Sequence, residues 1–143
     1  MPEIEMEVVP SFEGVSDALA RLKAFISDLG CPPDRASEVE LACAEALNNV
    51  VEHGNPASGN LRLHLNAVVS GDKLSVDVFD NGTPFDAPNA ETAKANLTSA
   101  KDTVAEGGFG WGLIHMLADA VTVTRKNNTN HLNVCFSLPN AQS

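Results

Sequence analysis

The chain has 143 residues and a formal net charge of −10. This length suits one domain, residues 1–143, that can bury a core without disulfides or metals. The acidity argues against a nucleic-acid or anionic-membrane surface. The apolar runs are too short to cross a bilayer, and the acidic start of the chain does not resemble a signal peptide. The cysteines at positions 31, 43 and 135 follow no metal or redox spacing, which indicates reduced thiols in a cytoplasmic protein.

The first part of the chain predicts an edge strand and two helices. Residues 4–9 have the alternation of a strand and stop at a proline. A turn is expected at 11–15, and apolar residues then recur at helical spacing up to Gly30, which we expect to form the C-cap. A proline pair leads into a second helix at about 34–53. Gly54 is expected to end it.

The second helix has two different faces, because positions three, four or seven apart lie on the same side. One face is apolar and predicts a core stripe of Val39, Cys43, Ala46 and Val50. The other carries Glu38, Glu45, Asn49 and Glu52. A carboxylate such as Glu45 can take a proton from a nucleophile, and the amide oxygen of Asn49 is a ligand suited to Mg²⁺. The alternative is an ordinary solvent-facing surface.

The second half of the chain predicts two hairpins separated by a long connection and a helix. Alternation at 61–66 and 74–79 indicates the first hairpin. A connection of such length in a small domain is typical of a lid, which we place at about 86–107. A helix follows at 111–118, and the last hairpin turns at 127–130. The order of elements predicts an α/β two-layer sandwich, a mixed, mostly antiparallel sheet with helices on one face.

The first hairpin ends in an acidic loop. Asp80 stands at the C-terminal end of the strand, and Gly82 follows shortly after. Such a carboxylate can accept a hydrogen bond from the exocyclic amine of a purine, while a glycine lets a ring approach the backbone. Ordinary turn chemistry is the alternative for this Asp-Asn-Gly segment.

A glycine cluster leads directly into the third helix, with glycines at 107, 108, 110 and 112. Backbone N–H groups freed by glycine and aimed by a helix N-terminus form an anion site for phosphates. A plain flexible hinge is the alternative. The surroundings match neither a Rossmann fingerprint, which needs a parallel βαβ unit, nor a Walker loop, which continues with Gly-Lys-Ser/Thr.

Taken in order, the three motifs resemble the Bergerat ATP-binding fold of histidine kinases, type II topoisomerases, mismatch-repair ATPases and anti-sigma-factor serine kinases. The chain is most similar to the anti-sigma branch. The motifs typical of that branch are Glu45-Ala-x-x-Asn49 followed by His53-Gly54, and then Asp80-x-Gly82-x-Pro84-Phe85-Asp86. The resemblance covers nearly the whole chain, from about Ile4 to Leu138.

The resemblance implies a role for each motif residue. Glu45 corresponds to the general base, and Asn49, rather than its neighbour Asn48, to the Mg²⁺ ligand. Asp80 corresponds to the adenine-binding acid and Gly82 to the glycine beside the base. The phosphate-loop glycines correspond to Gly108, Gly110 and Gly112. For His53, a structural role closing the helix is at least as well supported as a catalytic one, and for Trp111 we favour core packing over covering the nucleotide.

The resemblance implies a serine/threonine protein kinase and anti-sigma factor that uses ATP and Mg²⁺. It would phosphorylate a STAS-domain antagonist and bind a sigma factor, and because such proteins often dimerise, a homodimer is also implied. The sequence departs from the family in the basic residue that many members place near the γ-phosphate. Glu106 precedes the glycines here, and the lid cations are Lys94 and Lys101.

Phosphoryl transfer depends on charge neutralisation, so this departure favours an alternative: a non-catalytic, nucleotide-gated partner-binding module. A detached histidine-kinase domain is disfavoured, because the chain has no dimerising helical hairpin with a phosphoacceptor histidine.

Overall fold

The computed structural model describes residues 1–54, 59–84 and 109–139, and within them one sheet has the strand order β1-β2-β3-β5-β4. Its strands are β1 (Glu3–Val8), β2 (Leu63–Ser70), β3 (Lys73–Asp80), β4 (Ala120–Lys126) and β5 (Thr129–Ser137). Every pairing is antiparallel. The predicted edge strand and hairpins are therefore confirmed. The sheet of these described residues has no parallel pair, so it is antiparallel rather than mixed.

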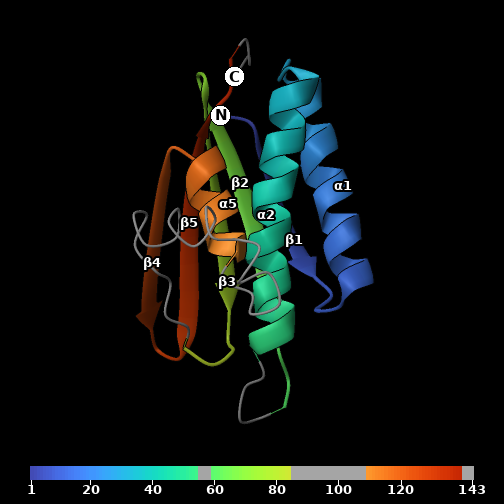
Figure 1. Cartoon of the computed structure of the whole chain (residues 1–143). Coiled ribbons are helices and arrows are strands. Elements are labelled where there is room, and N and C mark those ends of the chain that lie inside the picture. The colour runs from blue at the N-terminus through green and yellow to red at the C-terminus, as the bar shows by residue number, and fades with distance from the viewer. Residues whose placement is uncertain (55–58, 85–108, 140–143) are drawn as a thin grey trace.

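The helices α1 (Phe12–Asp28), α2 (Pro33–His53) and α5 (Phe109–Leu117) all lie on one face of this sheet (Figure 1). The alternation along each strand explains why. Side chains that point toward the helices are buried, as at Leu63 and Leu65, whereas those between them are only partly covered. The predicted two-layer α/β sandwich is confirmed. No helix among the described ranges is long and apolar enough to cross a membrane.

The turn expected at 11–15 is wrong, because α1 already begins at Phe12. Ser11 is its N-cap, and the side-chain oxygen of Ser11 accepts a hydrogen bond from the backbone N–H of Gly14 at 3.0 Å. A glycine is needed at position 14 because a Cβ there would lie 2.7 Å from the Cβ of Val9. Gly14 thus lets the first turn of α1 pack closely against Val9, just after β1, and it does not break the helix.

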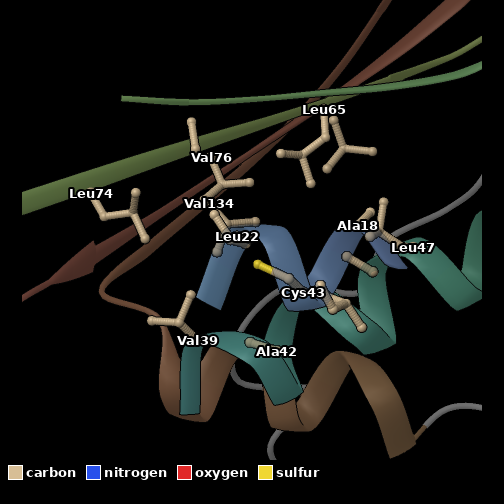
Figure 2. Packing of buried hydrophobic residues seen from close by; sticks show 14 of the residues in the cluster. Ala18, Leu22, Val39, Ala42, Cys43, Leu47, Leu65, Leu74, Val76 and Val134 are labelled. Carbon is tan, nitrogen blue, oxygen red and sulfur yellow. The ribbon is translucent and has the colours of Figure 1, made fainter. Parts of the chain in front are cut away.

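The core lies between the sheet and the helices (Figure 2). The apolar stripe predicted for α2 is buried, with Val39, Cys43, Ala46 and Val50 each at most 5% exposed. Burial raises the pKa of the Cys43 thiol to about 12, which keeps it protonated and unreactive. All three cysteines are free thiols, as predicted.

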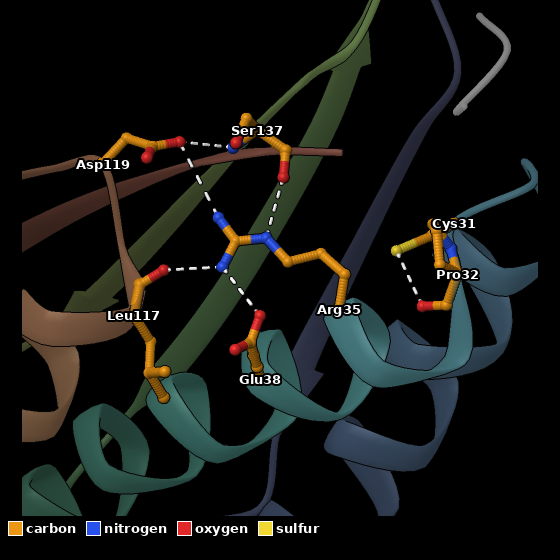
Figure 3. A network of polar contacts seen from close by, with 7 residues as sticks. All are labelled: Cys31, Pro32, Arg35, Glu38, Leu117, Asp119 and Ser137. Atoms are coloured by element: carbon orange, nitrogen blue, oxygen red, sulfur yellow. Dashed lines mark hydrogen bonds and ion pairs between the residues drawn. The ribbon is translucent and has the colours of Figure 1, made fainter. Parts of the chain in front are cut away.

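Arg35, in the first turns of α2, ties three elements together (Figure 3). Its guanidinium donates hydrogen bonds to the backbone oxygens of Ser137, from Nε, and of Leu117, from Nη1, both at 2.8 Å. It also pairs with Glu38 at 3.2 Å and with Asp119 at 3.8 Å. Because Leu117 ends α5, Arg35 fixes that helix against α2, about three turns before Glu45.

Candidate nucleotide-binding site

Asp80 is the last residue of β3 and is only 5% exposed. Its Oδ1 accepts two hydrogen bonds, from the backbone N–H of Gly82 at 2.8 Å and from Nδ2 of Asn130 at 2.9 Å. Neither bond uses Oδ2. The buried carboxylate is therefore held at one oxygen, while the other can accept a hydrogen bond from a ligand.

The loop after β3 is fastened to the end of α2. A Cβ at Gly82 would lie 2.8 Å from the Cα of Gly54, which caps α2, so only glycine allows this approach. The hydroxyl of Thr83 donates a hydrogen bond to the backbone oxygen of His53 at 3.0 Å. The side chain of His53 is 66% exposed and pairs with Glu52. The backbone of His53 thus joins the Asp80 loop to the helix that carries Glu45 and Asn49.

Glu45 lies on α2 facing the first turn of α5. A Cβ built at Gly110 would lie 2.6 Å from Oε2 of Glu45, so the carboxylate rests directly against that turn. Burial raises the pKa of the Glu45 carboxyl, and the charge of Glu52, which lies on the same helix face, raises it further. A carboxylate with a raised pKa is a better proton acceptor near neutral pH.

Two amide atoms beside Glu45 lack hydrogen-bond partners among the described residues. They are Oδ1 of Asn48 and Nδ2 of Asn49, and both are buried. Buried polar atoms are nearly always hydrogen-bonded, so this pair fits a site completed by a polar ligand. The described ranges contain no group of three or more His, Cys, Asp or Glu side chains able to hold a metal. Mg²⁺ typically takes few protein ligands and several from phosphates and water, so a magnesium ion here would be held by an amide oxygen, because Nδ2 only donates hydrogen bonds.

The structure thus places Glu45 against Gly110, and Asp80 beside Gly82. Both pairs lie along α2, which carries Glu45 and whose C-cap Gly54 packs against Gly82. Gly112 is buried within α5. Trp111 is 9% exposed and belongs to the core, which agrees with the packing role favoured for it. Gly108, the lid at 86–107 and its cations Lys94 and Lys101 lie outside the described residues, as does Glu106.

Asn130 and Arg125 also contribute to the site, although nothing in their own sequence neighbourhood indicates it. Nδ2 of Asn130 bonds Asp80, and Nη1 of Arg125 donates to Oδ1 of Asn130 at 2.8 Å. The sequence predicts Asn130 as part of a turn at 127–130, but β5 already begins at Thr129, so the turn is shorter and Asn130 is a strand residue. Asn130 reaches Asp80 because β5 pairs with β3, and Arg125 reaches Asn130 because β4 pairs with β5. The pairing of β3 with β5 joins distant segments, which local patterns do not reveal.

Comparison with known proteins shows which family the chain belongs to. Residues 9–136 match the family model of the histidine kinase-like ATPase domain. The chain is 31% identical over 130 residues to the serine-protein kinase RsbW of Staphylococcus aureus strain MSSA476, covering 87% of this chain and 80% of that protein.

Two solved structures share the fold at low sequence identity. One contains the RsbU and RsbW domains of Rv1364c from Mycobacterium tuberculosis, with a TM-score of 0.66 and 15% identity over 96% of this chain. This chain spans only 33% of that longer protein. The other is the SiaB–SiaC complex from Pseudomonas aeruginosa, with a TM-score of 0.62 and 13% identity, covering 94% of this chain and 89% of that one.

The chain therefore belongs to the histidine kinase-like ATPases, the class of Bergerat-fold proteins that its three motifs predict. Within that class it belongs to the anti-sigma factor serine/threonine kinase family, to which its curated relatives point. Membership in this family confirms the prediction of a protein kinase that uses ATP.

Proposed function

We propose that this chain is a serine/threonine kinase and anti-sigma regulatory factor that phosphorylates a STAS-domain antagonist and binds a sigma factor in the cytoplasm. The observation that carries the catalytic part is the contact between the Glu45 carboxylate and the first turn of α5 at Gly110. It sets a proton acceptor beside the helix N-terminus that follows the glycine cluster. The STAS and sigma partners follow from the resemblance to the anti-sigma branch.

In this proposal, the two loops bind opposite ends of ATP. Oδ2 of Asp80 accepts a hydrogen bond from the 6-amino group of adenine, and the bare backbone at Gly82 lets the ring lie close. Gly108, Gly110 and Gly112 bring no side chains to the N-terminal end of α5, and the backbone N–H groups not used within the helix bind the phosphates there. The close packing of Gly82 on Gly54 fixes the position of the base-binding loop relative to α2.

Glu45 acts on the acceptor residue. Its carboxylate takes the proton of the Ser or Thr hydroxyl while that oxygen bonds the γ-phosphorus and the bond to the ADP oxygen breaks. The partial burial that raises the pKa of Glu45 favours this proton transfer near neutral pH. Asn49 is the residue that would hold Mg²⁺, whose charge would neutralise the phosphate oxygens.

The kinase proposal is tested by transfer of radiolabel. The protein is incubated with labelled ATP, Mg²⁺ and a STAS-domain protein encoded in the same genome neighbourhood, and the experiment is repeated with Glu45→Gln. Label should appear on the STAS protein and fall by about a hundredfold or more in the variant. Glu40→Gln is the matched control, because Glu40 lies on the same helix but pairs with Lys23 at the surface.

The same experiment distinguishes the kinase from the alternative function of a non-catalytic binding module. ATP bound tightly by the wild type, with no label transferred to any candidate acceptor, would favour the non-catalytic, nucleotide-gated module.

The proposed binding of ATP at Asp80 is tested with Asp80→Asn, which we expect to abolish ATP affinity while the circular dichroism spectrum is retained. Unchanged affinity in that variant would refute the role of Asp80.

A further inference from the structure

We propose that Asn130, locked in place by Arg125, is a positioning residue that aims the Asp80 carboxylate at the nucleotide base. The inference rests on the proposed nucleotide binding at Asp80 and adds a residue from a distant hairpin to that subsite. Asn130 lies on β5 directly across from Asp80 on β3, and it is only 2% exposed.

Every hydrogen-bonding group of the Asn130 side chain has a partner. Nδ2 has two protons, and it donates one to Oδ1 of Asp80 and one to the backbone oxygen of Thr83, each at 2.9 Å. Oδ1 accepts from Nη1 of Arg125 at 2.8 Å. One amide thus holds both the carboxylate and the loop that follows it.

Arg125 determines which way this amide faces. A guanidinium only donates hydrogen bonds, so the amide oxygen must face Arg125 and the NH₂ group must face Asp80. Nη1 of Arg125 also donates to the backbone oxygen of Gly82 at 3.0 Å, which anchors the guanidinium to the same loop. Asn127 and Asn128 have φ of 54° and 61°, as a tight two-residue hairpin turn requires, and this turn sets Arg125 opposite Asn130.

The consequence concerns the orientation of the Asp80 carboxylate. With Oδ1 held by Gly82 and Asn130, rotation of the carboxylate would break two hydrogen bonds, so Oδ2 keeps one direction. Without Asn130, the bond from Gly82 is the one that remains to Oδ1 from the described residues. The carboxylate would then lose its preferred orientation, and its contact with the 6-amino group of adenine would weaken.

The test compares ATP with purine riboside triphosphate, which lacks the 6-amino group, by titration calorimetry. Wild-type protein should bind ATP about tenfold or more tightly than the analogue. Asn130→Ala should weaken ATP binding by about tenfold, weaken analogue binding much less, and bring the ratio of the two affinities close to one. A residue with only a structural role would weaken both nucleotides equally.

The chain offers a closely matched control in Asn133. It is also on β5, lies across from Asp77 on β3, and donates from Nδ2 to Oδ1 of Asp77 at 2.8 Å. Because three residues separate the pairs along each strand, this second pair lies on the opposite face of the sheet. Asn133→Ala should leave the ratio of ATP to analogue affinity unchanged.

Asn130→Leu guards against a cavity in the alanine variant, because leucine keeps roughly the shape of asparagine but has no proton to donate to Asp80. It should lose the preference for ATP in the same way. If both Asn130 variants fold and keep the wild-type affinity ratio, the positioning role is overturned while ATP binding stands. If the wild type itself binds no ATP, the proposed function fails with it.

Discussion

Oε2 of Glu45 lies so close to the backbone of Gly110 that a Cβ at position 110 would be 2.6 Å from it. Gly110→Ala should therefore displace the carboxylate, because the end of a flexible side chain moves more easily than a helix. We expect phosphoryl transfer to fall by about a hundredfold, as a small misplacement of a catalytic group can cause. Labelled-phosphate transfer at saturating ATP measures this.

The thermal midpoint of Gly110→Ala should change little, because alanine is the better helix former and the clash is relieved by the Glu45 side chain. A loss of activity that only follows unfolding would contradict the steric explanation. The double variant Gly110→Ala, Glu45→Asp provides a further check. Its carboxylate is one methylene shorter, so adding the alanine in that background should cost less activity than it does in the wild type.

The pH dependence of the reaction should report the interaction of Glu45 with Glu52. The Glu45 carboxyl has a raised pKa, chiefly from burial and additionally from the Glu52 charge. Glu52→Gln removes the second cause, so the pKa of Glu45 should fall. As a base must be deprotonated to act, the acidic limb of the pH–kcat profile should move to lower pH. An acidic limb that stays in place would show that another group controls it.

The same raised pKa predicts how Glu45 affects stability. An acidic group whose pKa is higher in the folded than in the unfolded state stabilises the fold when it is protonated. This stabilisation has its full size at pH values below the pKa of the group in the unfolded chain. It is lost as the pH rises through the folded pKa. Glu45→Gln resembles the protonated form and should unfold at a higher temperature than wild type at pH 8. At pH 4 or below the difference should largely vanish. A constant difference across this range would disprove the linkage.

Much of the fold could be predicted because its signals are local. The apolar stripe of α2 follows helical spacing, and the alternation of β2 and β3 follows the strand period. The start of α1 was misplaced because Gly14 resembles a turn residue. Its real constraint is the nearby backbone of Val9, which only the folded chain reveals.

The site was predictable to the extent that its residues lie in one segment each. Glu45 and Asn49 lie on one helix turn, and Asp80 and Gly82 on one loop. Asn130 was missed in the site and Arg35 in the fold, because each acts through a partner far along the chain, 50 residues away for Asp80 and 102 for Ser137. Such contacts depend on the order of strands in the sheet, where β5 lies between β3 and β4.

Arg35 should be important for stability. Its side chain is 15% exposed, and removing it leaves the backbone oxygens of Ser137 and Leu117 without their donor. We expect Arg35→Ala to lower the free energy of unfolding by about 2–4 kcal/mol. Arg35→Lys should rescue little, because a single ammonium cannot reproduce the guanidinium fork.

Urea unfolding measures the effect of Arg35, and Lys23→Ala is its control. Lys23 forms an exposed pair with Glu40 at 3.3 Å, and such surface pairs contribute about 0–1 kcal/mol. If the Arg35 and Lys23 variants unfold at the same urea concentration, the bonds from Arg35 to α5 and β5 do not stabilise the fold as described.

The choice between Asn48 and Asn49 as the Mg²⁺ ligand can be decided by nucleotide binding with and without the metal. We expect Mg²⁺ to tighten ATP binding in the wild type. Asn49→Ala should abolish that increment and leave metal-free affinity nearly unchanged, because Asn49 would contact the nucleotide only through the ion. Asn48→Ala should keep the tightening of ATP binding by Mg²⁺.

Both alanine substitutions remove a buried amide atom that lacks a partner among the described residues, so neither should destabilise the fold strongly. The opposite assignment would follow if Asn48→Ala alone lost the metal dependence.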